Sequence, residues 1–93
     1  MYYIITYDIT DDKRRRLLSG LLDKYGKRVN YSVYECEFNK TKLKNLIQQI
    51  QSQKCINPKE DSLRFYHIHQ NSISKSFEMC KKPEPFEVED MFF

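Results

Sequence analysis

The chain of 93 residues has no tryptophan, two glycines, three prolines and three cysteines. So little glycine and proline is typical of a compact folded chain and argues against a disordered one. The cysteines, Cys36, Cys55 and Cys80, lack CxxC spacing and are odd in number, which argues against a disulfide framework and against a zinc site. We interpret them as reduced thiols of a cytoplasmic protein.

Long apolar runs are also missing from the sequence. No stretch approaches the length of about 20 residues that a membrane-spanning helix needs. The start, MYYIITYD, has no basic segment and meets an acid at Asp8. We therefore expect no targeting segment and no membrane partner.

Aromatic and charged residues, by contrast, are abundant. The sequence has seven Tyr and six Phe, and 16 Lys and Arg against 13 Asp and Glu give a formal net charge of +3. A chain of this length forms one domain with a modest core, so oligomerisation would help to stabilise it. The small positive charge is compatible with a nucleic-acid partner but does not require one, so the local clustering of charge has to decide.

The first half of the chain predicts a strand, a helix and a second strand region. Residues 2–7 (YYIITY) are β-branched and aromatic on both faces, as in a central strand. Cap-type residues at 10–12 and a stripe of leucines predict a helix that closes at Gly26. Residues 27–38 predict either one bent strand or two short strands that reverse near residues 30–32.

The second half predicts another helix and another strand. Leu43, Leu46, Ile47 and Ile50 form an apolar stripe within residues 41–53, and residues 62–69 (SLRFYHIH) favour a strand. The resulting order is typical of an α+β sandwich of the ferredoxin-like kind, with two helices on one face of an antiparallel sheet.

The end of the chain does not belong to that unit in an obvious way. Pro83 and Pro85 favour an extended backbone, and the chain ends in Met91, Phe92 and Phe93. We therefore expect a single domain over residues 1–93 in which residues 78–93 form a C-terminal tail that pairs with a sheet edge, in the same protomer or in a partner. A frayed tail is the alternative.

A run of four cations, Lys13 to Arg16, follows two acids at the start of the predicted helix. Cations in a first helical turn cost roughly 0.3 to 1 kcal/mol each where exposed, because they repel the positive end of the helix dipole. One interpretation is a solvated charge run with an acidic cap. The other is an anion site, because arginine forks and helix amides together suit the phosphates of a nucleic acid.

Asp8 ends the first strand beside this basic turn. A lone acid after a strand is usually a turn or cap residue, but Mg²⁺ often binds one or two carboxylates together with waters and substrate phosphates. One Asp per chain becomes sufficient if two copies face each other across a twofold axis.

The stretch YDITDDKRRRLLSGLLDKYGKRVNYSVYEC, residues 7–36, resembles the Cas2 family of small CRISPR-associated proteins. The resemblance continues more loosely through residues 60–68 (EDSLRFYHI) and 80–93 (CKKPEPFEVEDMFF). It implies a ferredoxin-like homodimer in CRISPR antiviral defence, in which the last strand of each chain adds to the sheet of the other. It also implies a role in spacer acquisition with the CRISPR integrase as a partner.

The resemblance further implies the chemistry. Members are described as metal-dependent endonucleases that hydrolyse the phosphodiester bonds of RNA or double-stranded DNA. Asp8 matches their catalytic, metal-binding aspartate, with Mg²⁺ or Mn²⁺ as the cofactor. Tyr7 and Tyr34 match supporting positions. The expected nucleic-acid-binding residues, which combine matches to the family with the basic turn, are Arg14, Arg15, Arg16 and Arg28.

Two alternatives share the same residues. One is a non-catalytic dimeric scaffold that holds duplex DNA and bridges integrase subunits, because a binding platform and a nuclease can have the same fold and the same arginines. The other is a generic RNA-binding module on this fold. The segment YSVYECEF has the aromatics of such a module but lacks its glycines, which argues against it.

Overall fold

The computed structural model describes residues 1–87 of the chain. These residues form four strands and three helices. In chain order the elements are β1 (Tyr2–Asp8), α1 (Asp12–Leu22), β2 (Gly26–Asn30), β3 (Val33–Glu37), α2 (Lys40–Ser52), β4 (Ser62–Ile68) and the short α3 (Gln70–Ile73).

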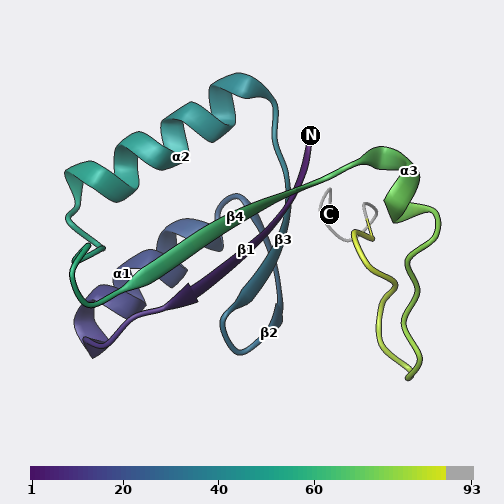
Figure 1. Ribbon diagram of the computed structural model, residues 1–93, viewed down its shortest axis with the longest axis horizontal. Coiled ribbons are helices and arrows are strands. Elements are labelled where there is room, and N and C mark those ends of the chain that lie inside the picture. Colours follow the sequence, from purple (N-terminus) through teal and green to yellow (C-terminus); the bar gives the residue numbers. More distant parts are fainter. Residues whose placement is uncertain (88–93) are drawn as a thin grey trace.

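The strands form one antiparallel sheet in the order β2-β3-β1-β4. Helices α1 and α2 lie together on one side of this sheet, and α3 and the segment after it lie at its other end (Figure 1). The predicted α+β ferredoxin-like sandwich is therefore confirmed. β1 is a central strand, and its last residue, Asp8, pairs with Ser62 of β4, whereas the pairing with β3 ends at Thr6.

The core lies between the sheet and the two long helices. β1 contributes Ile5 and Tyr7, whose side chains point to the helices, while alternation turns those of Ile4, Thr6 and Asp8 to the opposite, open face of the sheet. The other buried members of this core are Ile9, Leu18, Leu21, Leu22, Tyr34, Cys36, Phe38, Leu46, Ile50 and Cys55.

Side-chain caps start both long helices. The carboxylate of Asp11 accepts a hydrogen bond from the Arg14 amide at 2.9 Å, and this bond holds the pKa of Asp11 below its usual value. The side chain of Asn39 accepts one from the Lys42 amide at 2.8 Å at the start of α2. The first cap, Asp11, lies one residue before Asp12 and therefore fixes where α1 and its basic first turn begin.

The prediction that Gly26 closes the first helix is wrong. α1 ends at Leu22, and the amides of Lys24 and Tyr25 then donate to the Leu21 and Leu22 carbonyls in a tight turn. Gly26 instead opens β2. A Cβ there would overlap Cys36 Sγ and would lie 2.6 Å from the Glu35 carbonyl oxygen, so the close approach of β3 requires glycine.

The region predicted as one bent strand or two short strands is a hairpin. β2 and β3 reverse at residues 31–32, and a register shift between Arg28 and Asn30 bulges the first of them. The amide of Tyr7 donates to the Ser32 carbonyl at 3.2 Å, which ties the turn of the hairpin to β1.

The segment after α3 returns to the open face of the sheet. Phe86 is 5% exposed, packs edge-to-face on Tyr2 with ring centroids 5.5 Å apart, and donates its amide to Glu35 Oε1 at 2.8 Å. Residues 78–87 contain bends and turns and no strand. The rest of the predicted pairing tail lies outside the described residues, so pairing with a partner stays a prediction.

Within residues 1–87, no helix combines the length and the apolar character needed to cross a membrane.

Candidate metal and nucleic-acid site

Asp8 lies at the end of β1, opposite Ser62 of β4, and is exposed. Its carboxylate forms no hydrogen bond or ion pair with any of residues 1–87. Tyr7, the preceding residue, is 6% exposed and points to the helices, so the side chain of Asp8 points to the open face of the sheet. Both carboxylate oxygens are thus available to a ligand on that face.

Three of the four arginines predicted to bind nucleic acid line one hollow on the helix side of the sheet, which we call the arginine pocket. It measures about 270 Å³ and is lined by Tyr7, Asp12, Arg15, Arg16, Ser19, Arg28 and Tyr31. The structure therefore brings Arg15 and Arg16 of α1 together with Arg28 of β2. It does not bring Asp8 to them, because Asp8 lies on the opposite face and does not line the pocket.

The three arginines of the pocket differ in how they are held. Arg15 pairs with the carboxylate of Asp12, which is itself 83% exposed. Arg28 donates from Nε and Nη2 to the Tyr31 carbonyl at 3.1 and 2.6 Å. The guanidinium of Arg16 forms no ion pair or hydrogen bond with the residues that the structure describes. The pocket thus combines three cations with one carboxylate that a stronger anion could displace.

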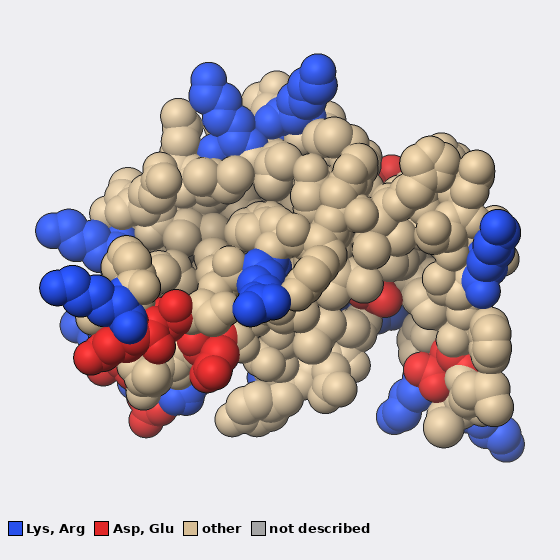
Figure 2. All heavy atoms as spheres, viewed as in Figure 1, with Lys and Arg blue, Asp and Glu red and all other residues tan. Residues whose placement is uncertain are grey.

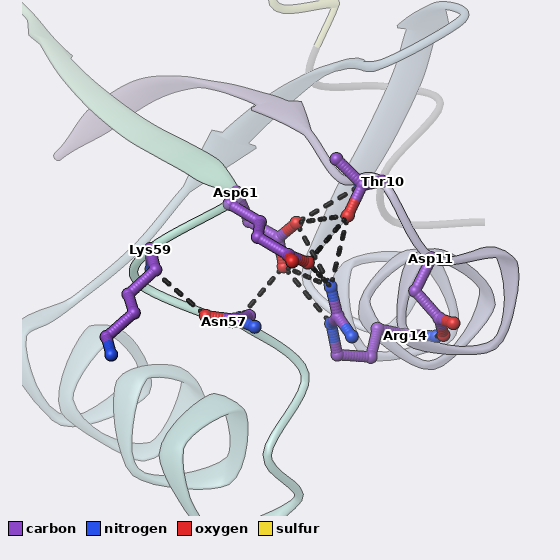
Figure 3. A network of polar contacts seen from close by, with 7 residues as sticks. Thr10, Asp11, Arg14, Asn57, Lys59 and Asp61 are labelled. Atoms are coloured by element: carbon purple, nitrogen blue, oxygen red, sulfur yellow. Dashed lines mark hydrogen bonds and ion pairs between the residues drawn. The ribbon is translucent and has the colours of Figure 1, made fainter.

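Arg14, the fourth arginine predicted to bind nucleic acid, does not line this pocket. It points to Asp61, in the loop before β4 (Figure 3). Its Nε lies 3.1 Å from Asp61 Oδ2, and its Nη2 lies 3.0 Å from the same oxygen and 3.2 Å from Oδ1. The side chain of Asp61 is fully buried. The guanidinium of Arg14 is therefore engaged within the protein.

Asp61 also binds the backbone on both sides of this contact. It accepts hydrogen bonds from the Asn57 amide at 2.8 Å and from the Thr10 amide at 3.1 Å. Burial alone would raise the pKa of Asp61, but these amides and the Arg14 guanidinium hold it below its usual value. The carboxylate thus joins the β1–α1 connection to the loop that precedes β4, next to Asp8.

Sequence reasoning missed Asp61 because two of its partners, Thr10 and Arg14, lie 51 and 47 positions earlier in the chain. Loop residues of this kind look like ordinary turn formers. Figure 2 shows acidic side chains gathered where α1 and β4 begin, with basic side chains around them. The start of α1 therefore carries both signs of charge.

Tyr34 does not line the arginine pocket but contacts two residues that do, Tyr7 and Ser19. It is fully buried, its ring centroid is 6.3 Å from that of Tyr7, and its hydroxyl donates to Asp23 Oδ1 at 2.5 Å. Burial and this hydrogen bond raise the pKa of Tyr34 well above its usual value. Tyr34 therefore supports the wall of the pocket that Tyr7 forms.

Within the described residues, no group of three or more His, Cys, Asp or Glu side chains could hold a metal ion. His67 stacks on Tyr3 with ring centroids 5.0 Å apart, and Nδ1 of His69 accepts the Asn71 amide at the start of α3. All three cysteines are free, and burial, with a smaller effect of Glu35, raises the pKa of Cys36 to about 12. Among residues 1–87, Asp8 therefore has no cluster of acidic, His or Cys side chains around it that would complete a metal site.

Comparison with known proteins gives relatives over nearly the whole chain. A protein of Synechocystis sp. named CRISPR-associated endoribonuclease Cas2 3 is 42% identical over 73 residues, covering 78% of this chain and 77% of the relative. A second Synechocystis protein, named CRISPR-associated endoribonuclease Cas2 2, is 38% identical over 89 residues, covering 96% of this chain and 94% of the relative.

Solved structures give the same result. The crystal structure of Streptococcus pyogenes Cas2 superimposes with a TM-score of 0.71 at 28% identity, covering 86% of this chain and all of that one. A chain of a structure described as a partial Cas6-RT-Cas1–Cas2 complex gives a TM-score of 0.63 at 38% identity, covering 84% of this chain and 83% of that one. The profile of the family described as CRISPR associated protein Cas2 matches residues 1–76. The chain therefore belongs to the Cas2 family of CRISPR-associated proteins.

Proposed function

We propose that this protein is a metal-dependent endonuclease that hydrolyses phosphodiester bonds in RNA or duplex DNA and acts with the CRISPR integrase in spacer acquisition. The names of its relatives support the nuclease activity, and the similarity to a chain of a Cas1–Cas2 complex supports the integrase partner. The observation that carries the proposal is the exposed carboxylate of Asp8, which has no partner among residues 1–87.

Asp8 fits a hard divalent cation. Carboxylate oxygens are the ligands that Mg²⁺ and Mn²⁺ prefer, and Mg²⁺ keeps waters and substrate phosphates around one or two protein carboxylates. When bound, such an ion would supply a water of lowered pKa and would polarise a phosphoryl oxygen. The role of Asp8 is to hold the ion at the end of β1, where β4 pairs with it and limits its movement.

A homodimer supports this site, because one chain supplies one carboxylate. The open face of the sheet carries apolar side chains, including Ile4, Val33 and the half-exposed Tyr66. Burying such a face against a second copy removes apolar area from water and brings the same residues in from both protomers. We propose that two Asp8 carboxylates meet in this way.

The arginine pocket binds the nucleic-acid backbone in this proposal. Arg15, Arg16 and Arg28 neutralise phosphates of the bound strand, and Tyr7 shapes the pocket wall. Arg14 keeps the backbone after Asp8 in place through Asp61. These residues bind and position the strand, and none of them is asked to transfer a proton.

The non-catalytic scaffold remains a second candidate, and one observation favours it. Asp8 and the arginine pocket lie on opposite faces of the sheet, so the pocket can hold a nucleic acid without presenting it to Asp8 of the same chain. A dimeric platform that bridges integrase subunits needs the arginines and does not need the metal.

Cleavage and binding, measured on the same variants, separate the two candidates. Labelled single-stranded RNA and duplex DNA are incubated with the purified protein in Mg²⁺, Mn²⁺ or EDTA. We expect Asp8→Asn to abolish metal-dependent cleavage while folding, dimerisation and binding persist. Glu37→Gln is the matched control, because it removes a carboxylate from the other end of the same open face. Equal cleavage by the wild type and Asp8→Asn would exclude Asp8 as the metal ligand, and binding without any cleavage would support the scaffold.

A further inference from the structure

Tyr31 is an exposed aromatic residue whose backbone is firmly held. It lies at the turn between β2 and β3, and 75% of it is exposed. Its amide donates to Asn30 Oδ1 at 2.8 Å, and its carbonyl accepts both hydrogen bonds from Arg28. The guanidinium carbon of Arg28 also lies 5.5 Å from the centroid of the Tyr31 ring. A ring so exposed makes little contribution to the core, although strand propensity alone suggests sheet packing for it.

The turn that carries Tyr31 is anchored to the centre of the sheet. Ser32 accepts the amide of Tyr7 through its carbonyl at 3.2 Å. The backbone that carries the ring is therefore held by β1, and Arg28 contacts both the carbonyl and the ring of Tyr31. A stacking surface that is fixed before binding loses less conformational entropy when a ligand arrives.

The arginine pocket lies directly beside this ring, since Tyr31 forms part of its lining. Its volume of about 270 Å³ is at the small end of ligand pockets, enough for a phosphate and part of a sugar. The hydroxyl group of Tyr7 has no hydrogen-bond partner among the described residues. Because no buried side-chain polar atom of these residues lacks a partner, this hydroxyl group is not buried and is open to the pocket. A base attached to such a sugar would extend out of the pocket, where the exposed Tyr31 ring offers an aromatic surface.

We propose that the arginine pocket and Tyr31 together form a binding site for one unpaired nucleotide. The phosphate binds to Arg15, Arg16 and Arg28, and the base stacks on the exposed face of the Tyr31 ring. Aromatic rings bind bases of single strands in this way, whereas the bases of a duplex already stack on one another. The inference rests on the proposed function insofar as the ligand is a nucleic acid, and it does not depend on cleavage at Asp8.

Asp12 competes with the ligand for Arg15. Its carboxylate pairs with Arg15 when no nucleic acid is bound, yet its side chain is 83% exposed and can move into water. An incoming phosphate therefore replaces Asp12 on Arg15. Removing the carboxylate should strengthen binding of the strand, the opposite of what removing an arginine does.

The test measures the binding of a short single strand and of a duplex of the same length by fluorescence anisotropy, in EDTA so that no cleavage occurs. Tyr31→Ala should weaken single-strand binding by about 5- to 150-fold, which corresponds to the loss of one aromatic–base stack. Duplex binding should change less than about twofold. Tyr31→Phe should bind like the wild type, and Phe77→Ala, which removes another exposed aromatic outside the pocket, is the matched control.

A second readout reports the stack itself. A strand with a single 2-aminopurine should lose fluorescence on binding to the wild type and to Tyr31→Phe, because the base is quenched when it stacks on an aromatic ring. Tyr31→Ala should not quench it. An abasic residue in place of this base should weaken binding to the wild type and have little further effect on Tyr31→Ala, and Asp12→Asn should raise single-strand affinity several-fold.

The following results would contradict the proposed nucleotide site. If Tyr31→Ala binds the single strand as tightly as the wild type, or loses duplex affinity equally, Tyr31 is not a stacking residue, although the proposed function stands. If Asp12→Asn weakens binding, the phosphate does not take its place on Arg15. If the wild type binds neither single strand nor duplex, both this inference and the proposed nucleic-acid function fail.

Discussion

Arg14 and Asp61 form a two-pronged ion pair that joins the start of α1 to the loop before β4. Arg14 Nε and Nη2 each lie within 3.2 Å of the carboxylate, whose side chain is fully buried. Because Asp61 also accepts the Thr10 amide, the pair fixes the chain two residues after Asp8. Part of the charged stretch at the start of α1 therefore stabilises the fold and does not face a ligand.

The lowered pKa of Asp61 predicts how stability depends on pH. A carboxylate whose pKa is lower when folded stabilises the protein above its ordinary value of 3.8, and that contribution is lost as pH falls through the folded value. We expect Asp61→Asn to unfold several degrees lower than the wild type near pH 7. The difference should shrink as pH falls below about 4. Thermal unfolding followed by circular dichroism measures both curves.

Glu60→Gln is the control for this prediction, because Glu60 lies 3.7 Å from the same guanidinium but is largely exposed. Its unfolding temperature should stay close to that of the wild type across the pH range. A difference between wild type and Asp61→Asn that stays constant down to about pH 2 would mean that the ionised carboxylate is not what the network needs.

The arginines should separate by their effect on the salt dependence of binding. Arg15→Ala and Arg28→Ala should each lower the slope of log K against log salt for duplex DNA by about 0.9 for every phosphate that the variant no longer binds. Arg14→Ala should leave the slope almost unchanged and lower thermal stability, because its guanidinium binds Asp61. Equal slopes for the wild type and the two pocket variants would remove the arginine pocket from the interface.

The two glycines of the chain should respond oppositely to alanine. Gly26→Ala places a Cβ against Cys36 Sγ and the Glu35 carbonyl and should destabilise the fold by about 1 to 3 kcal/mol. Gly20→Ala, in α1 with open space around it, should stabilise by up to about 1 kcal/mol. Adding Cys36→Ala to Gly26→Ala should recover only part of the loss, since the carbonyl remains. Urea denaturation gives these free energies, and full recovery would show that the backbone of β3 can yield.

The C-terminal tail should contribute to dimerisation. Truncation after Glu87 removes residues 88–93, with Phe92 and Phe93, and leaves the Phe86 contact with Tyr2 in place. Burial of two Phe rings contributes roughly 1.5 to 3 kcal/mol each before the cost of ordering the tail. We expect the truncated protein to shift toward monomer in sedimentation at low micromolar concentration. A truncated protein that remains fully dimeric would assign the tail another role, such as docking on the integrase.

Much of the fold follows from local pattern. The apolar YYIITY stretch and the leucine stripe predict β1 and α1, and their order with the later elements predicts the sandwich. The prediction fails where a contact with a residue further along the chain determines the local structure. Gly26 looks like a helix end, and the approach of Cys36, ten residues later, makes it the first residue of a strand.

The sequence names candidate site residues but does not show how they are arranged. The resemblance supplies Asp8 and the arginines, whereas only the pleat of β1 shows that Asp8 and Tyr7 point to opposite faces. The charge run alone cannot distinguish Arg14, which binds Asp61, from Arg15 and Arg16, which line the pocket. Tyr31 resembles other strand tyrosines in sequence, and its exposure becomes visible only at the tip of the hairpin.

The activity of mixed dimers tests most directly the claim that two Asp8 residues complete one metal site. Wild-type and Asp8→Asn chains with different affinity tags are co-expressed, and the heterodimer is purified through both tags. Its rate of Mg²⁺-dependent cleavage is then compared with those of the two homodimers. If the two carboxylates share the ion, the heterodimer should cleave almost as slowly as the Asp8→Asn homodimer. A heterodimer with half the wild-type rate would show that each Asp8 works alone, and one with the full rate would show that a single Asp8 per dimer is enough; either result contradicts a shared site.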